Sequence, residues 1–418
     1  MGLEFTFVEA VKFVVFSAVI LGIAVVLLPR AAKRDGLLTT RFLMFALGAR
    51  LAAGLLYFAV HMTVYEGTGD LFDYSERGTQ IAESIRALQP EAFFDDWFHT
   101  TEYAVGLIYT VTGTTLLGAI AIWCAFAFVG TFYFYKAFRV AFPNGNARLY
   151  AWLIFFLPSI LYWPSTLGKD ALVLLGLGVA TYGLAVLFRG ELGRGAALSL
   201  AGLAVVGVIR PPAGLALAGA ALAAMLGARI FRAVSRAPNW LPSMLVTVVL
   251  VAGAAGLTAM WVRTPEGLIA KQTESTQGRP GSFHRSNFDP PNPLSPLGLP
   301  YSVVSVNLRP FPWEVDLLNQ AATSIEMVLL AWLLVIRRRE IWSGLRGWRR
   351  NNFVAVVVLA WLFVSIVLAP IGNFGALARQ RVQVLPFLLM LPALVKPGSK
   401  METDAPDAVA HAGGRGGS

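Results

Sequence analysis

The sequence predicts an all-α, polytopic transmembrane protein with about eleven membrane-spanning helices. Of the 418 residues, 56% are hydrophobic and only 14% are charged, and the mean hydropathy is +0.63. The apolar residues form long runs that short basic or Pro/Gly-rich breaks separate, which is the pattern of helices that cross a bilayer repeatedly. A soluble globular domain does not need so much apolar surface.

A window of about 20 residues, with shorter spans allowed, places the helices along the chain. The expected spans are 8–28, 41–63, 114–135, 148–163, 169–188, 195–209, 211–228, 242–262, 318–336, 351–369 and 381–396. Residues 1–12 carry two glutamates and one lysine, and no small-residue cleavage site follows before Arg30. We therefore expect an uncleaved first span.

Basic residues set the orientation of these spans. If the group at Arg30, Lys33 and Arg34 is cytoplasmic, alternation places the other basic clusters on the same side, as the positive-inside rule requires. Those clusters are Lys136/Arg139/Arg148, Arg189/Arg194, Arg229/Arg232/Arg236 and Arg337/Arg338/Arg339 with Arg346/Arg349/Arg350. We expect the N-terminus outside and the C-terminus inside.

Residues 1–396 then form a single transmembrane domain with outer loops at 64–113 and 263–317, and the Gly-rich residues 397–418 form a disordered cytoplasmic tail. In the first loop, residues 78–89 and 91–98 mix apolar residues with charges, which predicts short interfacial helices. The second loop is rich in Pro, Gly, Ser and Asn from Gln277 to Pro300, which predicts irregular structure there.

Composition also excludes some functions. The net charge of +10 does not indicate nucleic-acid binding, because the basic residues punctuate the apolar runs instead of gathering on one soluble face. Cys124 is the only cysteine and lies inside an apolar run, so an internal disulfide and a thiolate metal cluster are both excluded.

The corner at residues 163–170 places a lysine and an aspartate at the edge of the hydrocarbon layer. Pro164 ends one helix, Ser165 or Thr166 can cap the next, and Lys169 adds a full charge to the partial positive charge of a helix N-terminus. This pattern predicts an anion site. In the alternative interpretation, Lys169 pairs with Asp170 or extends to lipid headgroups, and Asp170 only complements the helix dipole.

Three arginines add positive charge on the same expected side. Arg210 follows one span, and Arg379 and Arg381 precede the last one. They depart from the positive-inside trend, which indicates that they neutralise an anion such as a pyrophosphate.

The candidate carboxylates are Asp70 and Asp73, directly after the second span. Such residues can act as a general base, bind a divalent cation or be simply solvated, so a metal is possible and no cofactor is certain. An aspartate that activates an acceptor hydroxyl has to lie at the level of the headgroup of a lipid-borne substrate, which is this level.

The second loop holds four more candidates. Arg309 and Glu314 flank a Pro- and aromatic-rich patch, where they can pair across the turn, stack on a sugar ring or hold a phosphate; an aromatic-belt anchor with a local ion pair is the alternative. His284 and Arg285 belong either to a loop that orders over substrate or to a solvated loop. Glu326, inside the next span, should face the bundle interior, with no partner named.

These motifs together resemble a family. An acidic element at residues 70–74, the P-S-x-x-x-W-x-S-x-x-x-K-D corner at 158–170, the R-P corner at Arg210, the R-P-F-P-W-E stretch and the R-Q-R before the last helix are similar to those of actinobacterial GT-C type glycosyltransferases and polysaccharide polymerases of the O-antigen polymerase and EpsG kind. The resemblance covers most of the chain.

The resemblance implies an enzyme of the bacterial inner membrane that transfers a sugar or glycan from a polyprenyl phosphate or pyrophosphate donor to an envelope glycan or lipid-glycan acceptor on the extracytoplasmic face. Asp70 or Asp73 then matches the acidic residue of the family's first loop. Lys169, Arg210, Arg379 and Arg381 match its phosphate-binding cations.

Two other classes stay open. A lipid-linked glycan transporter or flippase predicts ionisable residues near the midplane of several helices, and apart from Glu326 the sequence suggests almost none. A non-catalytic membrane scaffold of an envelope assembly predicts outer charges that do not cluster. Charges scattered more than about 15 Å apart would count against a single site.

Overall fold

The computed structural model describes residues 7–88, 100–234, 286–291, 295–349 and 351–395. These ranges form helices and connecting turns with no β-strand, apart from one isolated bridge between Asn287 and Asn373. Five of the described helices are long and apolar enough to cross a membrane, or six if a bent pair counts as one span. The five are α1 (Phe7–Asp35), α2 (Thr40–Thr63), α5 (Leu116–Ala141), α8 (Lys169–Phe188) and α9 (Leu192–Ile209). The all-helical prediction is confirmed.

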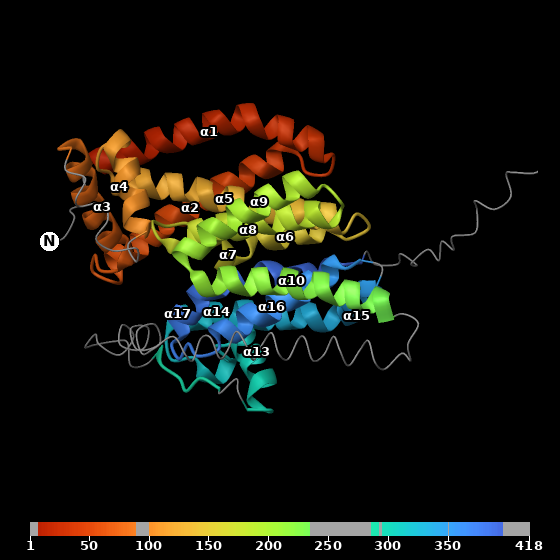
Figure 1. Ribbon diagram of the computed structural model, residues 1–418. Coiled ribbons are helices and arrows are strands. Elements are labelled where there is room, and N and C mark those ends of the chain that lie inside the picture. The colour runs from red at the N-terminus through yellow and green to blue at the C-terminus, as the bar shows by residue number, and fades with distance from the viewer. Residues whose placement is uncertain (1–6, 89–99, 235–285, 292–294, 350, 396–418) are drawn as a thin grey trace, which may run out of the picture.

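Helix α8 is the centre of the bundle and packs between α5 and α9 (Figure 1). Glycines allow the backbones to touch at both contacts. A Cβ on Gly130 of α5 would lie 2.6 Å from the carbonyl oxygen of Leu174, and a Cβ on Gly178 would clash with Gly130 itself. On the other side, a Cβ on Gly202 of α9 would lie 2.5 Å from the carbonyl oxygen of Gly176. Small residues at such contacts are typical of helices packed inside a bilayer.

Basic residues gather at one end of the bundle. At this end, Arg139 of α5 pairs with Asp35 of α1 at 3.5 Å, and Arg189 after α8 donates to the carbonyl of Val140. Arg337, after α14 (Leu318–Ile336), donates to Pro392 at the same end. Arg139, Arg189 and Arg337 belong to three different predicted basic clusters, and all three lie at this end of the bundle. Figure 1 shows α15 (Arg338–Arg346) at this end and α3, α4 and α17 at the other.

Several predicted spans are shorter or broken. The span expected at 148–163 is divided at Leu157 into α6 (Ala147–Phe156) and α7 (Pro158–Tyr162), because Pro158 starts a new helix after an extended residue. The span expected at 381–396 is a series of short helical turns, with α18 (Leu385–Met390) at its centre and prolines at 386 and 392. Helices α10 (Pro211–Val234) and α16 (Phe353–Leu368) overlap the spans expected at 211–228 and 351–369, but their apolar parts are shorter than those of the five long helices. The span expected at 242–262 lies outside the described residues.

The two long loops contain helices that lie against the bundle. In the first, α3 (Asp70–Arg86) and α4 (Thr100–Thr112) form a hairpin, so the helix expected at 78–89 begins earlier than predicted, and 91–98 lie outside the described residues. In the second, α13 (Gly298–Leu308) packs on α16, where Asn307 donates to Ser365 at 3.0 Å and accepts from Trp361 at 3.2 Å. Both loops therefore add packed structure to the end of the bundle.

Candidate functional site

Asp170 is the centre of a charged cluster at the N-terminus of α8. Its side chain is 3% exposed, and each carboxylate oxygen accepts from a different arginine. Arg210 donates to Oδ1 from Nη2 at 3.0 Å, and Arg379 donates to Oδ2 from Nε. A buried carboxylate is costly unless it is paired and hydrogen-bonded, and the two arginines supply both an ion pair and a hydrogen bond to each oxygen of Asp170.

Arg379 also binds a second carboxylate. It lies in α17 (Phe374–Gln380), and its Nη1 is 2.5 Å from Oδ2 of Asp70, the first residue of α3. Burial acts to lower the pKa of Arg379, but the carboxylates of Asp170 and Asp70 more than offset it and hold that pKa well above its usual value. The guanidinium therefore carries a full charge and joins the first outer loop to the central helix.

Local sequence explains how these side chains meet. Gly168 comes just before α8, and a Cβ there would lie 3.3 Å from Nη2 of Arg379, so a larger residue would push the arginine away. Trp123 of α5 donates to the carbonyl of Gly168 at 3.0 Å and fixes the corner. Asn373 caps α17 by accepting from the backbone N–H of Ala376 at 3.0 Å.

Lys169 is next to Asp170 but has a different environment. It is half-buried, and it makes no hydrogen bond or ion pair with the described part of the chain. The buried carboxylate of Glu102 in α4 exerts the strongest attraction on it. Lys169 therefore keeps its three N–H donors for a ligand. Within the described residues, Arg210 binds Asp170 through Nη2 only, so its Nε and Nη1 donors also remain for a ligand.

Aromatic side chains border this group, which we call the charge cluster (Asp70, Lys169, Asp170, Arg210 and Arg379). Tyr74 of α3 lies 3.7 Å from the Cβ position of Gly168, and burial raises the pKa of its phenol, which therefore stays protonated. His61 stacks on Tyr57 with ring centroids 4.1 Å apart, and its ring lies 3.1 Å from the Cβ position of Gly69. The border offers flat rings and hydroxyl groups beside the charges.

The other predicted site residues are not in this cluster. Asp73 is exposed on α3. Arg381 is fully buried and donates to the backbone carbonyls of Val306 and Arg309, so it ties the end of α13 to the bundle instead of facing a ligand. His284 and Arg285 lie outside the described residues.

Arg309 and Glu314 form a second, self-contained group. Their ion pair is 2.8 Å long, so of the predicted alternatives the structure shows pairing across the turn. The guanidinium of Arg309 lies 4.3 Å from the ring centroid of Phe288, which stacks on Phe374 at the start of α17. Through these rings, the group supports the helix that carries Arg379.

Sequence reasoning missed two residues. Asp170 was not among the predicted site residues, yet its carboxylate binds both Arg210 and Arg379. Arg50, in the middle of α2, is 1% exposed and donates to the carbonyl of Ile160 at 3.1 Å and to the Ser165 hydroxyl at 3.4 Å. A lone arginine inside an apolar run is a signal that could have identified it.

Glu326, which was expected to face the bundle interior, does so. It is buried and accepts from the backbone N–H of Ser159 at 2.9 Å and from the hydroxyl of the same residue at 2.6 Å. Arg381 supplies further electrostatic attraction to Glu326.

Across the described residues, no three His, Cys, Asp or Glu side chains gather in a way that could hold a metal ion.

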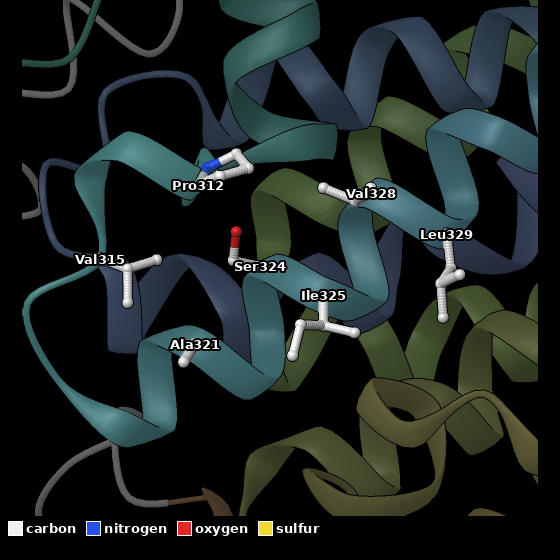
Figure 2. Close-up of a pocket in the computed structure, with 7 residues that line it drawn as sticks. All are labelled: Pro312, Val315, Ala321, Ser324, Ile325, Val328 and Leu329. Atoms are coloured by element: carbon white, nitrogen blue, oxygen red, sulfur yellow. The ribbon is translucent and has the colours of Figure 1, made fainter.

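An apolar pocket of about 320 Å³ lies on α14, apart from the charges. Figure 2 shows Ser324, Ile325, Val328 and Leu329 of α14 along it, with Pro312 and Val315 opposite. Helix α14, which lines the pocket, contacts α17, the helix that carries Arg379. Its walls suit a hydrocarbon chain.

Comparison with protein families, with curated proteins and with solved structures finds no match for this chain.

Proposed function

We propose that this protein is a glycosyltransferase of the bacterial inner membrane. It transfers a sugar or glycan from a polyprenyl phosphate or pyrophosphate donor to an envelope glycan acceptor on the extracytoplasmic face. The observation that carries the proposal is the charge cluster, in which Asp70, Asp170, Arg210 and Arg379 meet from segments far apart in the sequence. A non-catalytic scaffold gives no reason for these charges to converge.

The proposed topology has eleven spans, with the N-terminus outside and the C-terminus inside. The basic groups around Arg139, Arg189 and Arg337 lie at the end of the bundle opposite the N-terminus of α8. The positive-inside rule assigns that basic end to the cytoplasm. The charge cluster then faces outward, at the level where a lipid-borne phosphate lies.

The proposed reaction is a displacement at the anomeric carbon. The acceptor oxygen forms a bond to that carbon, the bond from the carbon to the phosphate oxygen breaks, and its electron pair leaves on the polyprenyl phosphate. Lys169 and the free N–H groups of Arg210 stabilise the departing phosphate. Asp70, whose side chain is 49% exposed, takes the acceptor proton. Asp170 orients the arginines and is not the base.

A transporter of lipid-linked glycans is the second candidate, because the interior holds more charge than the sequence suggested. Arg50, Glu326 and Arg381 are all buried. However, Arg50 and Arg381 donate to backbone carbonyls, and Glu326 accepts from Ser159, so each is bound within the helices. These partners favour a structural role for the three residues over a path for substrate.

The test compares Asp70→Asn with Asp73→Asn, its exposed neighbour on α3. The purified protein in proteoliposomes receives a polyprenyl phosphate sugar and an acceptor glycan extract, and elongated product is measured. We expect product from the wild type and from Asp73→Asn, and a loss of about 10²–10⁴-fold for Asp70→Asn. Lipid-linked glycan that crosses the bilayer without any elongated product would support the transporter and overturn the transferase.

A further inference from the structure

Helix α15 leaves the bundle direction sharply. It is bent by 61° from α14 at Arg337, whose buried guanidinium donates to the carbonyls of Pro392 and Val395, each at 3.1 Å. Arg337 also pairs with Glu340 at 3.4 Å. These bonds fix the first turn of α15 to the last helical turns of the described chain, so its direction is set by specific contacts.

The inner face of α15 packs tightly on the bundle. Ile341 and Leu345 are packed against the hydrophobic core, and Gly344 on the same side of the helix is buried. A Cβ on Gly344 would lie 2.6 Å from Cβ of Leu394. The helix therefore cannot turn to present a different face.

The outer face of α15 is basic and aromatic. Arg338, Trp342 and Arg346 follow one another at a spacing of four residues and are exposed, so they form one stripe along the helix. Trp342 is 58% exposed, and the guanidinium of Arg346 lies 5.2 Å from its ring centroid. Arg339 is exposed beside this stripe, and Arg338 donates to the carbonyl of Val335 through Nη1 alone.

The surface just before the bend is apolar. Trp332, Val335 and Ile336 of α14 are all exposed, and Trp332 is 64% exposed. An exposed apolar helix face that continues into a stripe of arginines and a tryptophan matches the change from hydrocarbon to headgroups at a bilayer surface.

We propose that the outer face of α15 binds the headgroups of anionic phospholipids, with α15 lying in the plane of the membrane interface. Charge complementarity carries this choice, because Arg338, Arg339 and Arg346 face outward and the one acidic residue of α15, Glu340, is paired with Arg337. The proposal is independent of the transferase. It gives the basic end of the bundle a lipid preference.

The test uses the full chain in detergent and native mass spectrometry, with phosphatidylglycerol and phosphatidylcholine as probes. The variant is Arg338→Gln/Arg339→Gln/Arg346→Gln. A basic residue near a membrane surface is worth about five-fold in affinity at low salt, so the three together should weaken phosphatidylglycerol binding by on the order of 100-fold. Phosphatidylcholine binding should not change.

The matched control is Arg30→Gln/Lys33→Gln/Arg34→Gln, which removes three exposed charges from the end of α1. There Arg30 donates to Val26 just as Arg338 donates to Val335. The control should keep the preference for phosphatidylglycerol. An equal loss in both variants, or no preference in the wild type, would overturn the proposal. Binding that appears only after removal of residues 397–418, which include Glu402, Asp404 and Asp407, would instead assign this face to the tail.

Discussion

Arg379 and Asp170 are 209 residues apart in the sequence, yet the guanidinium of one lies against the carboxylate of the other. The same guanidinium reaches Asp70, so one arginine joins three segments: α3, α8 and α17. Because Arg210 binds the remaining oxygen of Asp170, both oxygens of the buried carboxylate are satisfied. The relationship separates the charges that hold the site together from the charge, on Lys169, that remains for a ligand.

Asp170→Asn should destabilise the protein strongly. Removing one partner of a buried ion pair costs about 3–5 kcal/mol, because the other charge is left buried and unpaired. Here Arg210 loses its carboxylate, while Arg379 keeps only Asp70. Thermal unfolding in detergent measures the effect. Asp73→Asn removes an exposed carboxylate nearby and should change the unfolding free energy by less than about 0.5 kcal/mol. Equal shifts for the two variants would contradict the assigned role of Asp170.

Lys169→Ala should change stability little and reduce activity strongly. Because Lys169 has no ion pair in the described part of the chain, its loss should change the unfolding free energy by less than about 1 kcal/mol. Product formation should fall by about 10²–10³-fold, which is the usual effect of removing one electrostatic contact to the transition state. Lys169→Arg, which keeps the charge, should recover part of the activity. Normal product formation by Lys169→Ala would remove this residue from the mechanism.

Arg50→Leu should weaken the corner beneath Lys169. The substitution removes the donor to the carbonyl of Ile160 and the hydroxyl of Ser165, and groups left without a partner in the interior cost roughly 1–3 kcal/mol. Arg41→Leu, at an exposed position of the same helix, is the control and should have little effect on unfolding. If both variants unfold at the wild-type temperature, Arg50 does not support the corner.

Gly178→Ala should loosen the contact between α8 and α5. The added methyl group would meet the backbone of Gly130, and overpacking of this kind costs about 1–3 kcal/mol. Gly48→Ala in α2 adds the same group where nothing lies within 4 Å, so it should be neutral or slightly stabilising. The two melting temperatures, measured side by side, give the comparison.

The strongest sequence signals were the long apolar runs. Helix α8 begins and ends at the predicted residues, and α2 begins one residue early. The last predicted span is divided into short helical turns, and Pro386 and Pro392 lie in the first turns of two of them.

The pairing within the site was not predictable to the same degree. Lys169 and Asp170 are adjacent, and successive residues of a helix point about 100° apart, so only one of them can face the interior. The sequence does not say which, because the answer depends on where α17 packs. Lys169 was favoured for its charge, and Asp170 is the residue that is buried.

The glycine contacts of α8 also limit how the site can change shape. Since α8 touches α5 and α9 backbone to backbone, it cannot shift without opening the centre of the bundle, and Asp170 stays fixed with it. A substrate that needs more room between the carboxylates must therefore displace the segments on the outer side, which carry Asp70 and Arg379. Residues 66, 67 and 69, just before Asp70, all have positive φ angles. Asp70 is therefore the adjustable carboxylate of the charge cluster, and Asp170 is the stationary one.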